Sequence, residues 1–412
     1  MCIRDSKNAA LPALAATLLT DERVVLRNIP QIRDVQTMLA LLQDLGVAAE
    51  QLGQHDYALT AGTVRRCALD SALVQDIRAS ILLAGPLLAR CGEVELPPPG
   101  GDVIGRRRVD THFLSLRALG ASVEANHIRY VLKAPRGLQG SDIFQDEASV
   151  TATENAIMAA VTARGRTIIN NAACEPHVQD LCHLLGSLGA HIEGVGSNRL
   201  IIEGVERLHG GEYTIGPDNI EVGSFIGLAA ATGSDLLIRD AAPEHQRMTR
   251  LAFGRLGVSW DLRGQDIYVP GEQVLEVEDD ADGSIPKIDD GPWPAFPADL
   301  ISIAVVLATQ TRGTILIHEK MFESRLYFVD KLIAMGARII AGDPHRVVVA
   351  GPARLHGEEM ESPDIRAGMA LVIAALCAEG TSVIRNIRQI DRGYERLEER
   401  LQALGARIRR ER

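Results

Sequence analysis

The chain has 412 residues, a formal net charge of -11, 46% hydrophobic residues and only 4% aromatic residues. This length exceeds what one hydrophobic core usually holds and suits two domains of about 200 residues each. The acidic balance and the scarcity of aromatic side chains argue against a nucleic-acid partner, and the uncharged stretches are shorter than the ~20 residues of a membrane span.

The first six residues fit none of the pattern that follows them. The first repeat has a helix and later strands but no segment for a strand before them, so we expect the usual opening strand to be missing. The apolar run from Ala9 to Leu19 is interrupted by Pro12 and followed by Asp21 and Glu22, so we do not expect a secretory leader.

A short signature returns six times along the chain. A helix-like stretch ends in Leu or Met, then Gly follows, then Ala or Val, then a strand-like run. The spacing stays near ~70 residues, which indicates one supersecondary unit used repeatedly. Each glycine should adopt the left-handed conformation that ends a helix and turns the chain into a strand. They are Gly46, Gly120, Gly189, Gly257, Gly336 and Gly405.

Strands and helices alternate at short intervals in the predicted order. We expect helices over residues 35–45, 79–89, 156–162, 176–188, 300–308, 369–378 and 393–404. We expect strands over residues 24–26, 94–96, 167–169, 191–193, 200–202 and 382–384. This order predicts α/β or α+β layers. Six units divide most simply into two halves of three, which places domains at 8–216 and 217–412 with a ligand cleft between them.

One segment breaks the repeat. The strand over 94–96 runs into Pro97-Pro98-Pro99-Gly100-Gly101, and then into Asp102 and three arginines. Prolines stiffen one side of this segment and glycines free the other, so it can be a hinged lid that carries an acid and several cations. A solvated surface loop explains the same composition.

Several charged residues stand beside turns or helix starts. Arg78, Arg325, Arg366 and Arg392 are of the type that binds phosphate or carboxylate bidentately. Asp299 opens an apolar helix, and its simplest role is an N-cap. The six cysteines are isolated from one another and the histidines are scattered. We therefore expect free thiols in a reducing cytoplasm, and neither a metal nor a cofactor.

Together these residues resemble the UDP-N-acetylglucosamine enolpyruvyl transferase family, the 1-carboxyvinyltransferases that open peptidoglycan synthesis. The segments that carry the resemblance are Lys7-Asn8-Ala9-Ala10-Leu11-Pro12, Ile77-Arg78-Ala79-Ser80, the Pro-Gly-Gly loop with its Arg-Val-Asp end, Asp364-Ile365-Arg366 and Asp391-Arg392-Gly393-Tyr394-Glu395. The resemblance implies a two-domain inside-out α/β barrel with three βαβαββ units in each domain. It also implies a cytoplasmic enzyme, monomeric or weakly homo-oligomeric.

The resemblance also implies roles for individual residues. The sugar 3′-hydroxyl attacks C2 of phosphoenolpyruvate, C3 is protonated, and the tetrahedral ketal expels phosphate. Asp299 matches the base, Asp102 the acid on the loop, and Asp364 an acid beside the reaction centre. The cationic set around phosphoenolpyruvate is Lys7, Arg107 and Arg392, supported by Arg78 and Arg366. The sugar-nucleotide contacts are Asn8, Arg107, Val109, Asp110, Ser149, Val150 and Met321, with Arg325 close by.

The sequence departs from the family pattern at several positions. Most members carry Cys where Asp102 stands, and that thiolate is alkylated by fosfomycin, so we expect insensitivity to the drug. Apolar residues follow Asp299 where polar ones are usual, and Asn219 and Glu147 replace basic residues. Two alternatives stay open: an enzyme like the shikimate-pathway enolpyruvyl transferase, and a paralogue that binds UDP-sugar without turnover.

Overall fold

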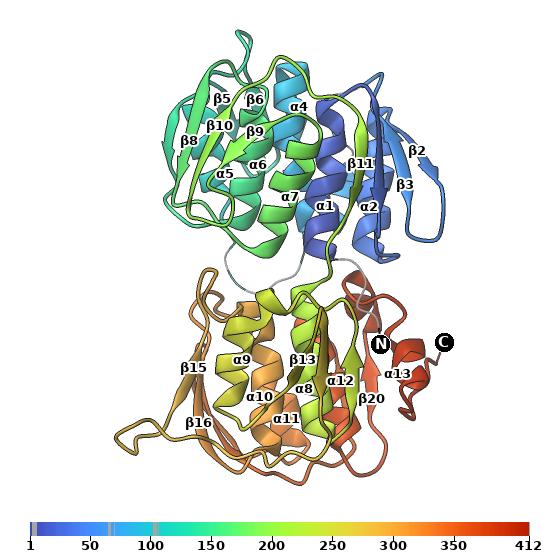
Figure 1. The fold of residues 1–412 in the computed structure, drawn as a ribbon, viewed down its shortest axis with the longest axis vertical. Helices are drawn as coiled ribbons and strands as arrows, with labels where there is room; N and C mark the ends of the chain where they lie inside the picture. Colours follow the sequence, from blue (N-terminus) through green and yellow to red (C-terminus); the bar gives the residue numbers. More distant parts are fainter. Residues whose placement is uncertain (2–5, 65–66, 70, 102–104, 106, 412) are drawn as a thin grey trace. The chain divides into compact units, whose positions relative to one another are not determined.

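The computed structural model describes residues 1, 6–64, 67–69, 71–101, 105 and 107–411. The chain forms two compact units. The N-terminal unit takes in Arg4–Gly101 and Arg107–Gly216, and the C-terminal unit takes in Pro217–Arg412, with Met1 grouped with it. The α/β fold class predicted from the sequence is confirmed (Figure 1).

The N-terminal unit contains three sheets in its described residues, ordered β11-β1-β3-β2, β4-β6-β5 and β7-β8-β10-β9. Its helices are α1 (Lys7–Ala16), η1 (Thr17–Leu19), α2 (Arg33–Leu45), α3 (Ser71–Asp76), η2 (Arg78–Leu83), α4 (Ala84–Cys91), α5 (Asp110–Ala118), α6 (Val150–Ala160) and α7 (Pro176–Ser187), where η marks a 3-10 helix. Its strands are β1 (Arg23–Arg27), β2 (Ala48–Gln51), β3 (Tyr57–Thr60), β4 (Glu93–Leu96), β5 (Ser122–Ala125), β6 (Tyr130–Lys133), β7 (Asp142–Phe144), β8 (Arg166–Asn170), β9 (His191–Glu193), β10 (Arg199–Glu203) and β11 (Gly211–Thr214).

The C-terminal unit likewise has three sheets in its described part, ordered β12-β14-β13, β15-β16-β18-β17 and β19-β20. Its helices are α8 (Asn219–Thr232), η3 (Pro243–Gln246), α9 (Arg247–Gly254), η4 (Ala298–Leu300), α10 (Ile301–Gln310), α11 (Val329–Ala334), α12 (Ile365–Cys377), η5 (Ile387–Arg392) and α13 (Leu397–Ala403). Its strands are β12 (Leu236–Ile238), β13 (Asp261–Arg263), β14 (Asp266–Val269), β15 (Lys287–Asp289), β16 (Gly313–His318), β17 (Ile339–Asp343), β18 (Arg346–Gly351), β19 (Glu359–Glu361) and β20 (Val383–Arg385).

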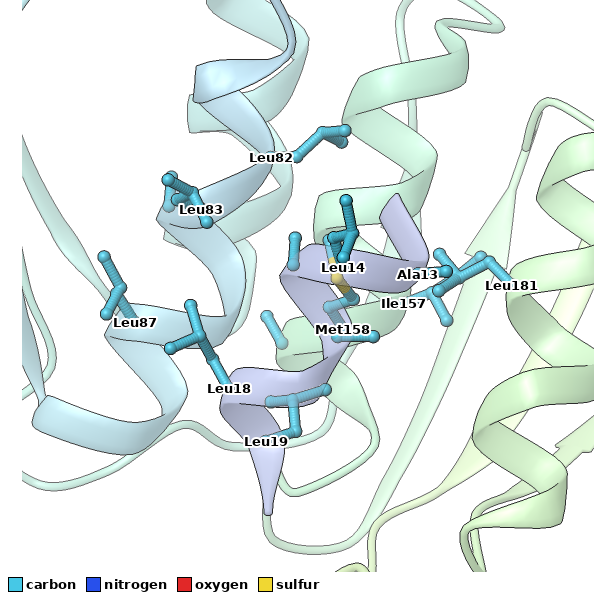
Figure 2. Close-up of a cluster of buried hydrophobic side chains, with 14 of the residues drawn as sticks. Ala13, Leu14, Leu18, Leu19, Leu82, Leu83, Leu87, Ile157, Met158 and Leu181 are labelled. Carbon is cyan, nitrogen blue, oxygen red and sulfur yellow. The ribbon is translucent and has the colours of Figure 1, made fainter. Parts of the chain in front are cut away.

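In each unit the most apolar helices lie at the centre and the sheets lie around them (Figure 1). α8, α10 and α12 are apolar on nearly every face and are buried over most of their length. A helix that is hydrophobic all round must be covered on all sides, which explains the inside position of these three. Figure 2 shows the corresponding core of the N-terminal unit, where side chains of α1, η1, η2, α4, α6 and α7 meet. None of the helices in the described part of the chain combines the length and apolar character that crossing a bilayer requires.

The six signature glycines confirm the repeat. All six have positive φ, between 78° for Gly257 and 101° for Gly46, Gly189 and Gly336. Gly46 is the left-handed C-cap of α2, and the chain then enters β2. Because L-residues adopt this conformation at a cost, the repeated Gly marks the same helix-to-strand turn in each unit.

Four of the six described sheets have one parallel pair of strands. β11 pairs parallel with β1, β7 with β8, β15 with β16 and β19 with β20. At β12 the backbone of Met1 takes part in the same kind of edge contact. Its amino group donates to the Leu237 carbonyl at 2.7 Å, and its carbonyl accepts from the Arg239 N–H at 2.8 Å. The remaining residues of the atypical start, apart from Ser6, lie outside the described residues.

The helices expected over 156–162 and 369–378 begin earlier in the structure, at Val150 and Ile365, and two other predicted helices are interrupted or shortened. The helix expected over 79–89 is divided into the 3-10 helix η2 and the α-helix α4. The helix expected over 393–404 begins only at Leu397, since Arg396 has φ 45° and interrupts helical continuity. A Cβ on Gly393 would lie 2.6 Å from Cγ2 of Ile365, so this break lets the chain pass close to the start of α12.

Candidate active site

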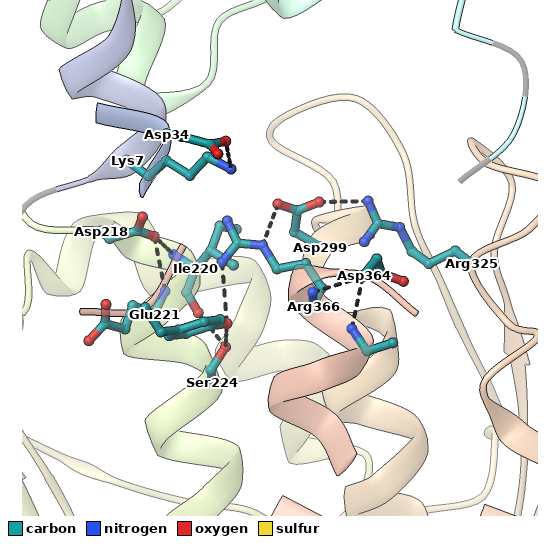
Figure 3. Close-up of polar contacts among 12 residues, drawn as sticks. Lys7, Asp34, Asp218, Ile220, Glu221, Ser224, Asp299, Arg325, Asp364 and Arg366 are labelled. Carbon is teal, nitrogen blue, oxygen red and sulfur yellow. Dashed lines mark hydrogen bonds and ion pairs between the residues drawn. The ribbon is translucent and has the colours of Figure 1, made fainter. Parts of the chain in front are cut away.

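Asp299 lies in η4, the single turn that leads into the buried helix α10. Its carboxylate is held by two guanidinium groups. Arg325 Nη2 lies 2.8 Å from Oδ1, and Arg366 Nε lies 2.8 Å from Oδ2 (Figure 3). The Asp299 side chain is 28% exposed, whereas those of Arg325 and Arg366 are 4% and 6% exposed. A carboxylate that faces solvent is therefore fixed from behind by two buried cations.

The N-cap role expected for Asp299 is wrong. The residue before η4 is Pro297, and neither η4 nor α10 has a side-chain cap hydrogen bond. Two guanidinium groups, each carrying a full charge, hold the carboxylate, so it turns toward them and away from the N–H groups at the helix start.

Asp364 is the N-cap of α12. Its Oδ1 accepts from the backbone N–H groups of Arg366 at 2.8 Å and Ala367 at 3.0 Å. This cap places Arg366 in the first turn of α12, with its side chain toward Asp299 (Figure 3). Asp364 thus lies beside the Asp299 cluster, and it orients Arg366.

Arg366 is also fixed by Tyr394. Its Nη1 donates to the Tyr394 hydroxyl at 3.2 Å, and that hydroxyl lies 3.2 Å from Ser224 Oγ. Burial disfavours the charge of Arg366, but the carboxylate of Asp299, together with Tyr394 and Asp218, raises its pKa above the ordinary value. Arg366 is therefore a permanent cation. The prediction did not assign Tyr394 a role, although it stands two residues after Arg392 in one of the resemblance motifs.

Arg392 ends η5, and its Nη1 donates to Gln389 Oε1 at 3.1 Å. Its element packs against α12, where the side chain of Ile390 lies against Gly368. Met321 follows β16 and is 39% exposed. The C-terminal unit therefore brings Asp299, Arg325, Arg366 and Asp364 into one cluster, with Arg392 on the neighbouring η5.

In the N-terminal unit Lys7 begins α1, which Ser6 caps by accepting from the Ala9 N–H at 3.3 Å. Lys7 Nζ lies 2.8 Å from Oδ2 of Asp34, a buried carboxylate in the first turn of α2 (Figure 3). Asn8 is the second residue of α1 and is half-buried. Lys7 lies at the positive end of the α1 dipole, and the ion pair with Asp34 compensates its charge and limits its conformations.

Both ends of the loop that interrupts the repeat lie close to Arg78. A Cβ on Gly101, which has φ 105°, would lie 2.7 Å from the Cβ of Arg78. The Arg78 Nη2 donates to the carbonyls of Arg107 at 2.7 Å and Arg108 at 3.2 Å. Burial and then the charge of Arg107 lower the pKa of Arg78 to about 10. Asp102 lies outside the described residues.

Four of the expected nucleotide contacts lie at two helix starts. Val109 and Asp110 begin α5, and Ser149 and Val150 begin α6. Arg108, which the sequence analysis did not single out, links the two starts. It lies 3.1 Å from a carboxylate oxygen of Asp110 and 3.1 Å from one of Asp146, shortly before α6. N-terminal N–H groups of helices favour anions such as phosphate.

The structure also describes two positions at which this sequence departs from the family pattern. Asn219 is buried at the start of α8, where its carbonyl accepts from Gln246 Nε2 at 2.8 Å. Glu147 is exposed, two residues before Ser149. Among the residues with described positions, no His, Cys, Asp or Glu side chains form a group of three that could hold a metal ion.

Comparison with known proteins defines the class. The model of the family described as EPSP synthase (3-phosphoshikimate 1-carboxyvinyltransferase) matches residues 3–401. The enolpyruvyl transferase NikO from Streptomyces tendae has a TM-score of 0.86 at 24% identity, over 99% of this chain and 95% of that one. EPSP synthase from Acinetobacter baumannii has a TM-score of 0.74 at 15% identity, over 98% and 95%. These structures show the fold, and the chain belongs to the EPSP synthase family of enolpyruvyl transferases.

Curated relatives narrow this class. The UDP-N-acetylglucosamine 1-carboxyvinyltransferase of Bradyrhizobium diazoefficiens is 59% identical over 405 residues, which cover 98% of this chain and 94% of the relative. Its counterpart in Treponema denticola is 58% identical over 403 residues, with the same shares. The resemblance stated from the sequence is confirmed: within the family, the chain falls among the UDP-N-acetylglucosamine 1-carboxyvinyltransferases, and it is a transferase.

Proposed function

We propose that this protein transfers the enolpyruvyl group of phosphoenolpyruvate to the 3′-hydroxyl of UDP-N-acetylglucosamine, in the cytoplasm, as the first committed step of peptidoglycan synthesis. The observation that carries the proposal is the Asp299 carboxylate, partly exposed and fixed between the buried Arg325 and Arg366. An oriented carboxylate of this kind suits a general base for a hydroxyl group.

The proposed reaction has two stages. First the hydroxyl oxygen bonds to C2 of phosphoenolpyruvate, its proton passes to Asp299, and C3 gains a proton from Asp102. Then the bond from C2 to the phosphate oxygen breaks. C3 returns a proton to Asp102, which restores the carbon–carbon double bond. The leaving phosphate takes up the proton held by Asp299. No redox change or further reactant is required.

In this proposal, cationic side chains and helix N-termini bind the two substrates. We assign Lys7, Arg107 and Arg392 to the phosphate and carboxylate of phosphoenolpyruvate, with Arg78 and Arg366 in support. Fixed positive charge at these positions stabilises the charge that develops in the ketal and on the leaving phosphate. The starts of α1, α5 and α6 supply the proposed sugar-nucleotide contacts, listed as Asn8, Val109, Asp110, Ser149 and Val150. We assign Met321 and Arg325 to sugar-nucleotide binding as well.

The acceptor is tested by phosphate release. UDP-N-acetylglucosamine and shikimate 3-phosphate are each supplied with phosphoenolpyruvate, and inorganic phosphate is measured. We expect release only with UDP-N-acetylglucosamine, because the relatives above 50% identity carry that name. Release with shikimate 3-phosphate alone would select the shikimate-pathway alternative. Saturable UDP-sugar binding without release would select the non-catalytic alternative, to which the apolar segment after Asp299 points.

The base is tested by Asp299→Asn. The amide keeps the size of the side chain but accepts no proton from the hydroxyl group, so we expect kcat to fall by about 10²- to 10⁴-fold. KM for phosphoenolpyruvate should change much less. Unchanged kcat in this variant contradicts the assignment of Asp299.

A further inference from the structure

Two buried carboxyl groups lie behind the Asp299 cluster. Asp290 directly follows β15 and Glu319 directly follows β16, and these strands are parallel neighbours with Asp289 opposite His318. Parallel strands end at the same edge, so both carboxyl groups lie together there. Glu319 is 0% exposed and Asp290 is 2% exposed. No part of the proposed reaction uses either residue.

Each carboxyl group has one oxygen engaged by the backbone. Glu319 Oε1 accepts from the N–H groups of Met321 at 3.2 Å and Phe322 at 3.0 Å, and Asp290 Oδ1 accepts from the Lys320 N–H. The second oxygens, Glu319 Oε2 and Asp290 Oδ2, are buried and have no hydrogen-bond donor among the described residues. Two buried acceptors without a donor are costly unless a proton lies between them.

A shared proton satisfies both oxygens. Two carboxylates in contact cannot both be ionised, so one of them keeps its proton. Burial, followed by the hydrogen bond with Asp290, raises the pKa of Glu319 to about 9, which identifies Glu319 as the protonated partner. Asp290 then accepts the bond from Glu319.

The protonation state of Glu319 determines which carboxylate attracts Arg325. Arg325 Nε lies 3.8 Å from Glu319 Oε2, too far for a hydrogen bond, whereas its Nη2 lies 2.8 Å from Asp299 Oδ1. Beside a neutral acid the guanidinium is free to pair with Asp299. An ionised Glu319 would attract the same cation within the interior, where charge interactions are strong.

We propose that Glu319 and Asp290 form a proton-sharing pair that positions Arg325, and through it the carboxylate of Asp299. This inference rests on the proposed role of Asp299 as the base. Glu319 and Asp290 are positioning residues, because they touch neither substrate. Other charged or titratable groups around them are Asp289, which pairs with both Lys287 and Lys320, and two histidines. His318 interacts electrostatically with Asp290, and Nδ1 of His345 lies 2.8 Å from the Glu319 carbonyl.

The pH dependence of kcat separates positioning from a purely structural role. The wild type should lose kcat as pH rises through about 9, since the proton on Glu319 is then released. In Glu319→Gln the amide can donate to Asp290 and accept from the backbone as the protonated acid does. We expect this variant to support turnover at neutral pH and to lack the alkaline loss that Glu319 causes.

Asp290→Asn tests the opposite state, in which Glu319 is ionised. Its amide can donate to Glu319 Oε2, which favours the ionised glutamate and draws Arg325 away from Asp299. We expect kcat at neutral pH to fall by about tenfold or more, as for a misplaced catalytic group, with a smaller change in KM. A wild-type kcat in Asp290→Asn, or an unchanged alkaline loss in Glu319→Gln, overturns the proposal.

Infrared spectroscopy tests the proton directly and needs no turnover. At neutral pH the difference spectrum between the wild type and Glu319→Gln should contain a carboxylic-acid C=O band. The same comparison with Glu193→Gln, an exposed glutamate on β9, should contain none. Absence of the Glu319 band refutes the shared proton whatever the acceptor sugar proves to be. Failure of the phosphate-release assay with the band present refutes only the proposed function.

Discussion

At the scale of single residues, the candidate site depends on buried charges that compensate one another. Arg325 and Arg366 are each less exposed than Asp299, the one group they share. Removing one member of a buried ion pair costs more than the pair itself contributes, because the remaining charge keeps no partner. The same pairing therefore fixes the Asp299 carboxylate and stabilises the unit that contains it.

Arg366→Gln should destabilise the C-terminal unit strongly. It removes one of the two cations from Asp299, which keeps Arg325, and the charged donor from Tyr394, so we expect a loss of about 1.5–3 kcal/mol in the free energy of unfolding. Tyr394→Phe removes only the hydroxyl and should cost about 1 kcal/mol. Urea unfolding followed by tryptophan fluorescence measures both, since Trp260 and Trp293 lie in this unit. Equal losses in the two variants would show that the ion pair contributes little.

Asp102 predicts the response to fosfomycin. A carboxyl group lacks the soft thiolate that opens an epoxide, so the wild type should keep its activity and gain no mass after incubation with the drug. Asp102→Cys restores the thiol and should be inactivated with time, with one covalent adduct by intact-mass spectrometry. The same treatment of Asp102→Ser, which offers no thiol, is the control. An adduct on the wild type contradicts the prediction.

At the scale of elements, the helix-to-strand turns were the most predictable feature. Left-handed glycine has a local physical cause, so its six positions could be identified without any tertiary contact. Helix ends that depend on packing could not be predicted from the sequence. The break between Arg392 and Leu397 depends on the approach of Gly393 to Ile365, which lies 28 residues earlier in the chain.

Two glycines of the C-terminal unit should respond differently to alanine. At Gly405, with φ 98°, an added Cβ meets nothing within 4 Å, so only backbone strain of about 1 kcal/mol is expected. At Gly257, with φ 78°, the Cβ would lie 2.7 Å from the Val274 carbonyl oxygen and the Glu276 amide nitrogen. Backbone cannot yield as a flexible side chain does, so Gly257→Ala should cost about 2 kcal/mol more.

Tryptophan fluorescence during urea unfolding compares the free energies of the two glycine variants in the same unit. If Gly405→Ala is as unstable as Gly257→Ala, the whole loss in the free energy of unfolding comes from the left-handed conformation. The close contact with the backbone around Val274 would then contribute nothing.

At the scale of the whole molecule, the sequence predicted the class and the residue types of the site but not their arrangement. The period of the glycines led to two halves, and each unit has three sheets in its described part. The partners of Asp299 could not be predicted, because Arg325 and Arg366 lie 26 and 67 residues from it. Glu319 and Asp290 gave no signal either, because nothing local in the sequence predicts their burial.

The two units should also differ in their response to pH. His112, in the N-terminal unit, is buried between helices. Its Nδ1 accepts from Asn155 Nδ2 at 2.9 Å, because Asn155 Oδ1 is engaged by the Gly85 N–H, and its Nε2 then donates to Thr151 Oγ1 at 3.2 Å. Burial, and then the charge of Arg78, lower the pKa of His112 to about 3. Both ring nitrogens are used in the neutral form, so protonation breaks the bond with Asn155.

The sign of the effect follows from proton uptake. The unfolded chain protonates His112 near pH 6.5 and the folded chain only near pH 3, so the stability from the neutral ring is present above 6.5 and lost as pH falls. This loss is about 1.4 kcal/mol per pH unit. Glu154, buried in the same unit, has a raised pKa through burial and then Glu175, which gives the opposite slope. The wild type alone therefore conceals the contribution of His112.

His112→Gln isolates the contribution, since the glutamine carbonyl can accept from Asn155 and its amide can donate to Thr151 without titrating. Between pH 6.5 and pH 5 the free energy of unfolding of the variant should rise by about 2 kcal/mol relative to that of the wild type. Far-ultraviolet circular dichroism detects unfolding of both units, whereas tryptophan fluorescence reports the C-terminal unit alone. The gain should appear in circular dichroism, and an identical shift in fluorescence would mean that the two units unfold together. A difference between variant and wild type that does not change with pH contradicts the prediction, because a neutral ring buried in this network must resist protonation.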